Sequence, residues 1–130
     1  RFLSSFRVFV ELVRICGDDP SPHQAAAIGR IASHFMTLRR MSLSVAGMLE
    51  AGKDVSVEAA LVKELGNNFV KLLPEIARLV VPDLSAVDPD KQRLFRETFE
   101  ETLMLSPSFT LRGGTREIMR GVIARGLGLR

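Results

Sequence analysis

The stretch SPHQAAAIGRIASHFMTL, residues 21–38, decides the fold class because it carries both the start signal and the repeating pattern of an α-helix. Ser21 and Gln24 have the types and spacing of a capping box, and Pro22 suits the first helical position. The pattern predicts a helix from there to about Ala51, roughly 45 Å long. Its apolar stripe consists of Ile28, Ile31, Phe35, Leu38, Val45 and Leu49.

One further helix is predicted before this one and another after it. The first ends before Gly17 and places five apolar side chains on one face: Phe2, Phe6, Phe9, Val10 and Val13. The next is capped by Asp54 or Ser56. It is expected to kink at Pro74 and to close at Pro82. Its predicted core stripe consists of Leu61, Leu65, Phe69, Leu72, Ile76 and Val80.

A fourth helix opens at Asp88, where an N-cap type is again followed by proline. Ser106 and Pro107 are expected to end it, because the residue before a proline is pushed out of the helical region. Its apolar stripe consists of Leu94, Phe95, Phe99 and Leu103. Residues 108–114 then form a loop.

Thr115 is predicted to cap a last helix that runs to about Arg125. Helical spacing therefore accounts for nearly the whole chain, and no segment alternates as a strand would. The predicted fold is all-α: five antiparallel helices, arranged as an antiparallel four-helix bundle with an additional C-terminal helix. Residues 1–130 form a single domain.

Composition limits the classes of protein that this chain can represent. Of its 130 residues, 46% are hydrophobic and 25% are charged, which is the balance of a globular domain. No apolar run approaches the roughly 18 residues of a membrane span, so we expect a cytoplasmic protein. Cys16 is the single cysteine and cannot form an internal disulfide. The helical pattern is already running at Arg1, which predicts that this is a piece of a longer chain.

Positive charge is concentrated at the C-terminal end. The net charge is +3, whereas residues 112–130 alone carry five arginines against Glu117, a balance of +4. The chain has no tyrosine or tryptophan that could stack on bases, which argues against nucleic acid as a partner. A small anion or an acidic partner surface is the better prediction.

The sequence Gly113-Gly114-Thr115 stands directly before the last helix. Glycines leave backbone N–H groups unobstructed, and a helix N-terminus carries partial positive charge, so this corner suits a phosphate or a sugar hydroxyl. Arg112 and Arg116 flank it. The alternative interpretation is that the glycines only form a tight turn.

The stretch RGGTREIMRGVIARGLGL, residues 112–129, resembles the closing segment of acyl-CoA dehydrogenases. In that family a loop of the form aromatic-Glu-Gly-Thr precedes a helix of the form x-x-Ile-x-Arg-x-x-Ile-Ala-Arg. The residues that match the helix are Ile118, Arg120, Ile123, Ala124 and Arg125. The resemblance implies the family's C-terminal helical domain, FAD as cofactor, an acyl-CoA substrate and packing into a homo- or hetero-oligomer, a dimer or tetramer.

The resemblance also implies which residues serve the site. Gly114, Thr115, Arg116 and Glu117 fall where family members contact the FAD. Gly113 occupies the position of the loop glutamate that removes the substrate's α proton, and glycine cannot take a proton. The sequence therefore predicts no catalytic residue here. Either the base lies upstream of this chain, or the chain is a blank subunit paired with an active one.

A second family feature, an Arg-x-x-Phe-Gly loop that reaches the FAD of a neighbouring subunit, is only partly kept. Arg14 and Gly17 match it, but the phenylalanine is missing, and Asp18 and Asp19 follow. Arg14 is therefore a candidate FAD contact. The family's Gln-x-x-x-Gly-Gly segment is absent.

Two alternatives to a flavoprotein domain remain from the sequence. The chain can be a helical assembly domain that binds no flavin, or an unrelated helical bundle with chance similarity at its end. His34 lies beside an apolar stripe with no carboxylate or cysteine at ligand spacing, so we expect a partly buried histidine and no metal site. The sequence does not indicate an acyl chain or steroid preference.

Overall fold

The computed structural model describes residues 5–129, and these form helices joined by short loops, without a strand. The α-helices are α1 (Phe6–Cys16), α2 (Pro22–Glu50), α3 (Ser56–Val80), α4 (Pro89–Phe109) and α5 (Arg116–Gly126). A short 3-10 helix, η2 (Leu84–Ala86), lies in the connection between α3 and α4. The prediction of an all-α chain with five α-helices is confirmed.

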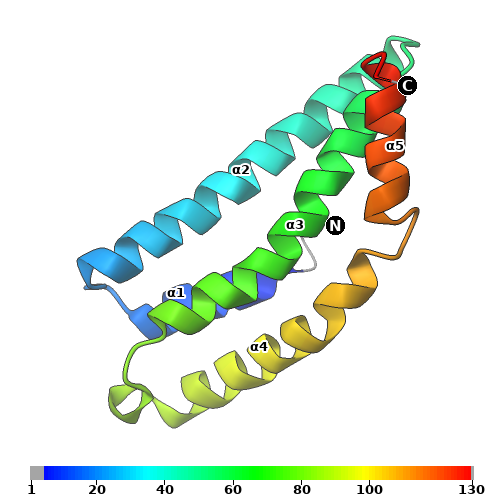
Figure 1. Ribbon diagram of the computed structural model, residues 1–130. Helices are drawn as coiled ribbons and strands as arrows, with labels where there is room; N and C mark the ends of the chain where they lie inside the picture. Colours follow the sequence, from blue (N-terminus) through cyan, green and yellow to red (C-terminus); the bar gives the residue numbers. More distant parts are fainter. Residues whose placement is uncertain (1–4, 130) are drawn as a thin grey trace.

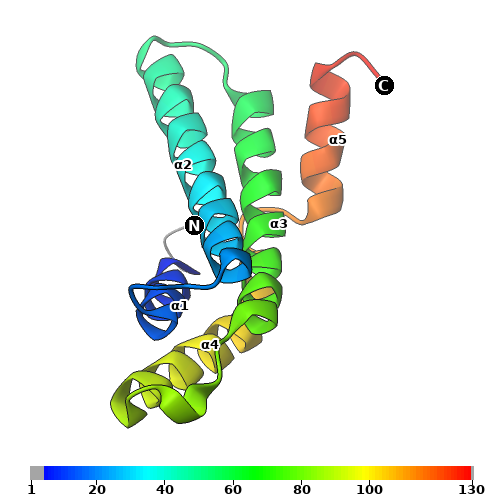
Figure 2. The ribbon, with the colours of Figure 1, turned by 90° about the vertical axis from the view of Figure 1, so that its left-hand side faces the viewer.

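The two longest helices, α2 and α3, form a hairpin that sets the length of the molecule (Figure 1). α1 and α4 pack on each other and lie against one half of this hairpin, where α4 also contacts α3. The view turned by 90° shows α5 on the opposite side, where it runs beside the other half of α3 (Figure 2). α3 thus contacts each of the other four α-helices.

The hydrophobic core lies where α1, the first half of α2, the second half of α3 and α4 meet. Its largest fully buried apolar side chains are Leu12, Ile31, Leu73, Val8 and Val70. Phe35 is buried and its ring meets that of Phe69 edge-on, with the centroids 4.8 Å apart. Phe69, Ile76 and Val80 are buried as predicted.

The helix starts predicted from local signals are present. The Ser21 hydroxyl accepts a hydrogen bond from the Gln24 N–H at 3.3 Å, and Gln24 Oε1 accepts one from the Ser21 N–H at 2.9 Å. Gln24 Nε2 also donates to the Val80 carbonyl at 3.1 Å, so the capping box joins the start of α2 to the end of α3. Asp88 caps α4 by accepting from the N–H groups of Asp90 and Lys91.

The predicted apolar face of α1 is only partly buried, since Phe9 packs against the core and the ring of Phe6 contacts that of Phe35, but the most buried positions are others. Phe6 is 42% exposed and Val13 is 39% exposed, whereas Val8, Leu12 and Ile15 are buried. Apolar residues occur on both sides of this short helix, so spacing alone did not select a face. Contact with α4 decided it. Phe2, which belonged to the predicted stripe, lies outside the described residues.

The predicted end of the fourth helix is also wrong, because α4 continues through Pro107 to Phe109. Proline has no N–H to give to the carbonyl of Leu103, four residues earlier. The Ser106 hydroxyl donates to that carbonyl instead, at 3.1 Å. A side chain therefore replaces the missing backbone bond, and the helix survives for one more turn.

α3 likewise passes Pro74 without a break, and its ribbon bends along its length (Figure 1). The residue at its N-cap position is Val55, not either predicted candidate. Asp54 Oδ1 nevertheless accepts from the Ser56 N–H at 2.9 Å and so satisfies one free donor of the first turn. This contact lowers the pKa of the Asp54 carboxyl, with the Ser56 hydroxyl as the larger cause.

Predicted core residues in the outer half of the hairpin are exposed. Leu49 on α2 and Leu61 and Leu65 on α3 are 62%, 38% and 45% exposed. No residue of α2 after Leu38 is buried. The reason is length: this half of the hairpin extends beyond α1 and α4 (Figure 1). Leu103 on α4, also predicted as core, is 44% exposed because the buried face of α4 is Phe95, Thr98, Thr102 and Ser106.

Candidate functional site

Residues 110–115 connect α4 to α5 and contain the glycine pair. Gly113 and Gly114 have φ values of 71° and 102°, in the left-handed region that residues with a Cβ rarely adopt. A Cβ on Gly114 would also lie 2.7 Å from Met119 Cε. The two adjacent glycines are therefore required by the backbone path that turns the chain into α5.

Lys63 of α3 binds the backbone of this corner, which consists of Gly113, Gly114 and Thr115. Its ammonium group donates to the carbonyl oxygens of both Gly113 and Gly114. In a trans peptide the carbonyl of one residue and the N–H of the next point in opposite directions. The N–H groups of Gly114 and Thr115 therefore point away from Lys63, on the side of the corner opposite α3.

The next residue of α3, Glu64, holds the start of α5. Glu64 is only 9% exposed, and its Oε1 accepts from Arg116 Nε at 3.1 Å and from Arg120 Nε at 3.3 Å. Asn68 Nδ2 reaches the same oxygen at 3.5 Å. Glu64 Oε2 is buried and has no hydrogen-bond partner among the described residues. One carboxylate thus anchors two arginines of α5, and the cluster retains a net positive charge.

Thr115 occupies the N-cap position of α5, as predicted, but its side chain makes no capping bond. It bonds the carboxylate of Glu117, and this bond is the largest cause that lowers the pKa of that carboxyl. A bond to the backbone N–H of Glu117 and the charges of Arg116 and Arg120 act in the same direction. The first turn of α5 therefore carries an exposed carboxylate that stays ionised into mildly acidic solution.

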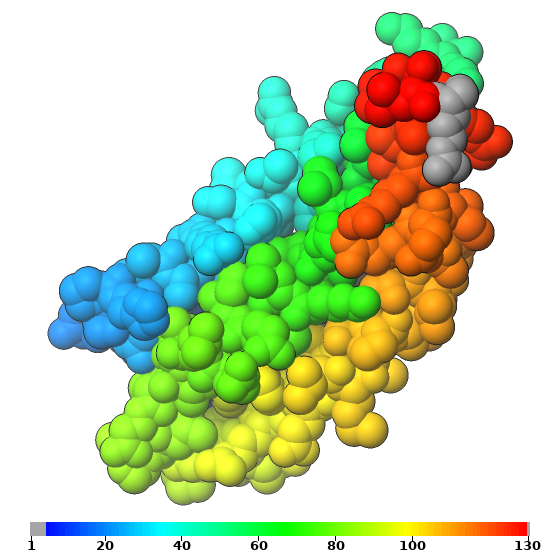
Figure 3. Space-filling model, viewed as in Figure 1, coloured from blue at the N-terminus to red at the C-terminus, as the bar shows by residue number. Residues whose placement is uncertain are grey.

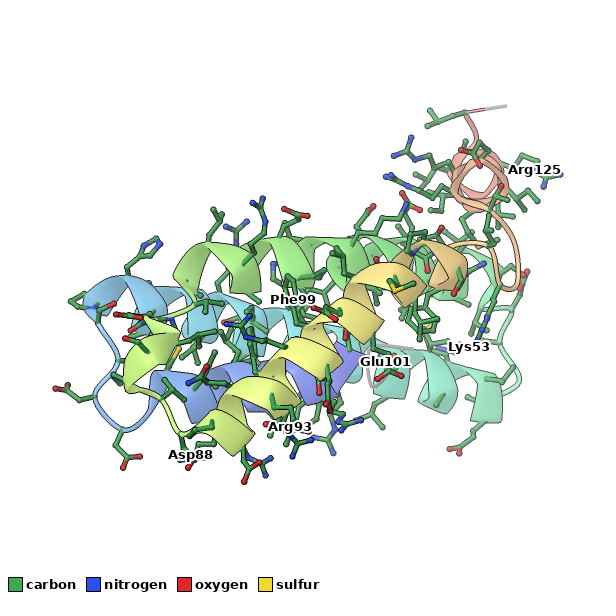
Figure 4. The ribbon with its side chains drawn as sticks, turned by 90° about the horizontal axis from the view of Figure 1, so that it is seen from below. Lys53, Asp88, Arg93, Phe99, Glu101 and Arg125 are labelled. Atoms are coloured by element: carbon green, nitrogen blue, oxygen red, sulfur yellow. The ribbon has the colours of Figure 1, made fainter. Side chains whose placement is uncertain are left out.

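The structure places four of the predicted FAD contacts, Gly114, Thr115, Arg116 and Glu117, at one corner. Arg112, which precedes them, lies over the ring of Phe109 at 5.4 Å from the centroid. Figure 4 shows α5 at one edge of the molecule, with Arg125 projecting from its outer side. Two cations of the C-terminal cluster, Arg116 and Arg120, are thus engaged by α3 through Glu64, whereas Arg125 faces outward.

Arg14, the fifth predicted contact, is not near the corner within this chain. It lies in the last turn of α1 and pairs with Glu11 at 2.8 Å. α1 and α5 occupy opposite sides of the α2–α3 hairpin (Figure 2). The prediction for Arg14 concerned the cofactor of a neighbouring subunit, and this geometry leaves it as a prediction.

Shallow grooves follow the seam between α2 and α3, which lie side by side in the space-filling view (Figure 3). The largest, about 530 Å³, is lined by Arg30, Ser33, His34, Thr37, Leu38, Leu65, Asn68, Phe69 and Leu72. His34 is partly buried there and stacks on Phe69, with ring centroids 5.1 Å apart. A second, of about 300 Å³, is lined by Leu38, Ser42, Val45, Ala59, Val62, Lys63 and Gly66.

Within residues 5–129, no three His, Cys, Asp or Glu side chains gather closely enough to hold a metal ion. Within the same residues, no helix combines the length and the apolar character needed to cross a membrane.

Comparison with protein-family models, with curated proteins and with solved structures finds no match to this chain. The resemblance to acyl-CoA dehydrogenases therefore rests on the residues of the C-terminal stretch alone and stays a prediction.

Sequence reasoning missed Lys63, Glu64 and Gly126. Gly126 lies in α5 where a Cβ would come within 2.1 Å of Val57 Cγ2, so its absent side chain permits the close approach of α5 to α3. Lys63 and Glu64 sit about fifty residues from the corner and carry no local motif. The one available signal was that Ala60, Glu64 and Asn67 share a helical face, and this face is the buried one.

Proposed function

We propose that this chain is the C-terminal helical domain of a flavin-dependent acyl-CoA dehydrogenase. In this proposal the helices form the family's four-helix bundle with an additional C-terminal helix, and the α4–α5 corner contacts the FAD. The observation that carries the proposal is the binding of both glycine carbonyls by Lys63, from which we infer that the Gly114 and Thr115 N–H groups face outward at the N-terminus of α5. This arrangement fits a phosphate or sugar oxygen, which the resemblance identifies as part of FAD.

The corner supplies binding and no acid–base chemistry. Dehydrogenation of an acyl-CoA requires a carboxylate that takes the α proton while a hydride leaves the β carbon for the flavin. Gly113 has no side chain, and Glu64 is turned inward and occupied by Arg116 and Arg120. Under this proposal the base comes from elsewhere in the same polypeptide or from an active partner subunit.

Assembly is the second part of the proposal. The outer half of the α2–α3 hairpin carries exposed apolar side chains, among them Leu43, Leu49, Leu61 and Leu65. An apolar surface of this kind is typical of a protein interface. We infer that it packs on the rest of the polypeptide or on other subunits of a homo- or hetero-oligomer, in the cytoplasm and without nucleic acid.

The decisive experiment measures flavin content and acyl-CoA dehydrogenation in the protein that carries this chain. It is purified alone and then together with any subunit encoded beside it. Activity of the protein alone would locate the base in its own polypeptide, and activity only in the pair would make this chain the blank subunit. Flavin absent from both preparations would refute the proposal.

The competing function is a helical assembly domain that binds no flavin. It is favoured by the ion pair of Arg116 with Glu64, since that guanidinium already has a partner within its own chain. The visible absorbance of the purified protein separates the two, because bound FAD is coloured and an assembly domain is not.

A further inference from the structure

Polar contacts contribute directly to the attachment of α5 to the rest of the chain. None of its residues is buried, and Ile118 is more than half exposed. The apolar contribution to its docking is therefore small in comparison with that of the core helices. What holds it is a set of directed bonds from two neighbouring residues of α3, Lys63 and Glu64.

The two residues act on different parts of the corner. Lys63 binds the carbonyls that precede α5, and Glu64 binds Arg116 and Arg120 in the first and second turns of α5. Gly113 and Gly114 have no Cβ, so their peptides can rotate at little steric cost. An external contact is then needed to select one orientation, and the Lys63 ammonium supplies it.

We propose that Lys63 and Glu64 are positioning residues for the α4–α5 corner. Lys63 fixes the Gly113 and Gly114 peptides so that the following N–H groups face outward, and Glu64 fixes Arg116 and with it the direction of α5. The part that concerns a ligand rests on the proposed function. The positioning itself rests only on contacts within this chain.

Hydrogen exchange followed by mass spectrometry on the full-length protein tests the positioning. The variants are Lys63→Met and Glu64→Gln, with Lys63→Arg as the conservative rescue. Lys71→Met and Glu75→Gln are matched controls, because both residues are exposed on the same helix and away from α5. The comparison uses peptides from the corner and α5 against peptides from α1, α2 and α4.

We expect Lys63→Met and Glu64→Gln to speed exchange in the corner and α5 by about tenfold or more, because bonds to charged groups stabilise local structure by that factor. Exchange elsewhere stays at the wild-type rate, and Lys63→Arg recovers most of the protection. Wild-type exchange in Lys63→Met would overturn the proposal. So would equal exchange in Lys63→Arg and Lys63→Met, since the cation would then not be the cause.

Flavin affinity tests whether the positioned corner binds a ligand. It is measured on the same variants, each at the same number of degrees below its own melting temperature. We expect Lys63→Met to weaken flavin binding about tenfold and Lys63→Arg to restore it. Unchanged affinity despite faster exchange would overturn the link between positioning and ligand. A wild-type protein without flavin would refute the proposed function, and the exchange result would still decide the positioning on its own.

Discussion

Phe35 is the residue around which the aromatic part of the core is built. It is 7% exposed, and its ring lies 5.2 Å from that of Phe6, 5.5 Å from Phe9 and 4.8 Å from Phe69. Three helices therefore depend on one side chain, and the surroundings cannot collapse to fill the space that its removal would leave.

We predict that Phe35→Ala lowers the free energy of unfolding by about 3 to 5 kcal/mol, through lost burial and the cavity left behind. Denaturant titration measures the change. Met36→Ala is the control, because the neighbouring Met36 is 72% exposed and its loss should cost less than about 0.5 kcal/mol. A loss below about 1 kcal/mol for Phe35→Ala would contradict the core assignment.

Thr115 occupies the N-cap position of α5, but its side chain bonds Glu117 and does not cap the helix. Its bond to the Glu117 carboxylate is the largest cause of the lowered pKa of that carboxyl. A lowered pKa stabilises the folded state above the ordinary pKa of about 4.3, and this contribution is lost as the pH falls through the lowered value.

Thr115→Ala should therefore raise the pKa of Glu117 toward its ordinary value, so that the stabilisation is smaller and its loss on acidification is complete at a higher pH. The charges of Arg116 and Arg120 remain and keep part of the shift. Titration of the Glu117 side-chain carboxyl by NMR provides the measurement. An identical midpoint in wild type and variant would show that the hydroxyl contributes nothing.

At the scale of elements, the contact between α5 and α3 is set by a missing side chain. Gly126 approaches Val57 so closely that a Cβ would lie 2.1 Å from Val57 Cγ2, whereas nothing lies within 4 Å of a Cβ on Gly121 of the same helix. The two glycines thus have the same intrinsic helix propensity, but a side chain fits at Gly121 and does not fit at Gly126.

We predict that Gly121→Ala slows hydrogen exchange in α5, since alanine favours a helix over glycine by about 1 kcal/mol. Gly126→Ala gains the same propensity but should speed exchange, because the new methyl group pushes the end of α5 away from α3. Adding Val57→Ala to Gly126→Ala should restore protection. Equal behaviour of the two single variants would mean that α5 does not dock on Val57.

At the scale of the whole molecule, the α2–α3 hairpin is longer than the helices that cover it. Its inner half shares the core with α1 and α4, whereas its outer half touches α5 on one side and leaves apolar side chains exposed (Figures 1 and 2). This uneven covering is the basis for the proposed assembly.

The double variant Leu61→Glu and Leu65→Glu tests that assembly, because both side chains are partly exposed on the outer half of α3. We expect a smaller oligomer by sedimentation with unchanged helix content, since burying two carboxylates at an interface is costly. Met104→Glu on α4 is the control, because Met104 is 80% exposed and lies on a different helix. An unchanged mass for the double variant would place any interface elsewhere.

The sequence by itself determined the starts of α2 and α4, because capping is local chemistry between residues two or three positions apart. Ser21 with Gln24 and Asp88 with Lys91 satisfy N–H groups that no tertiary contact is needed to reach. The need for glycine before the last helix was also readable in this way, since it follows from backbone sterics.

Only the tertiary structure decided which face of each helix is buried and how the corner is held. α1 carries apolar residues on both sides, so its packing against α4 selected Val8 and Leu12 over Val13. Lys63 and Glu64 meet Gly113 and Arg116 across about fifty residues of sequence. Such contacts depend on where two helices cross, and periodicity within one helix carries no information about that crossing.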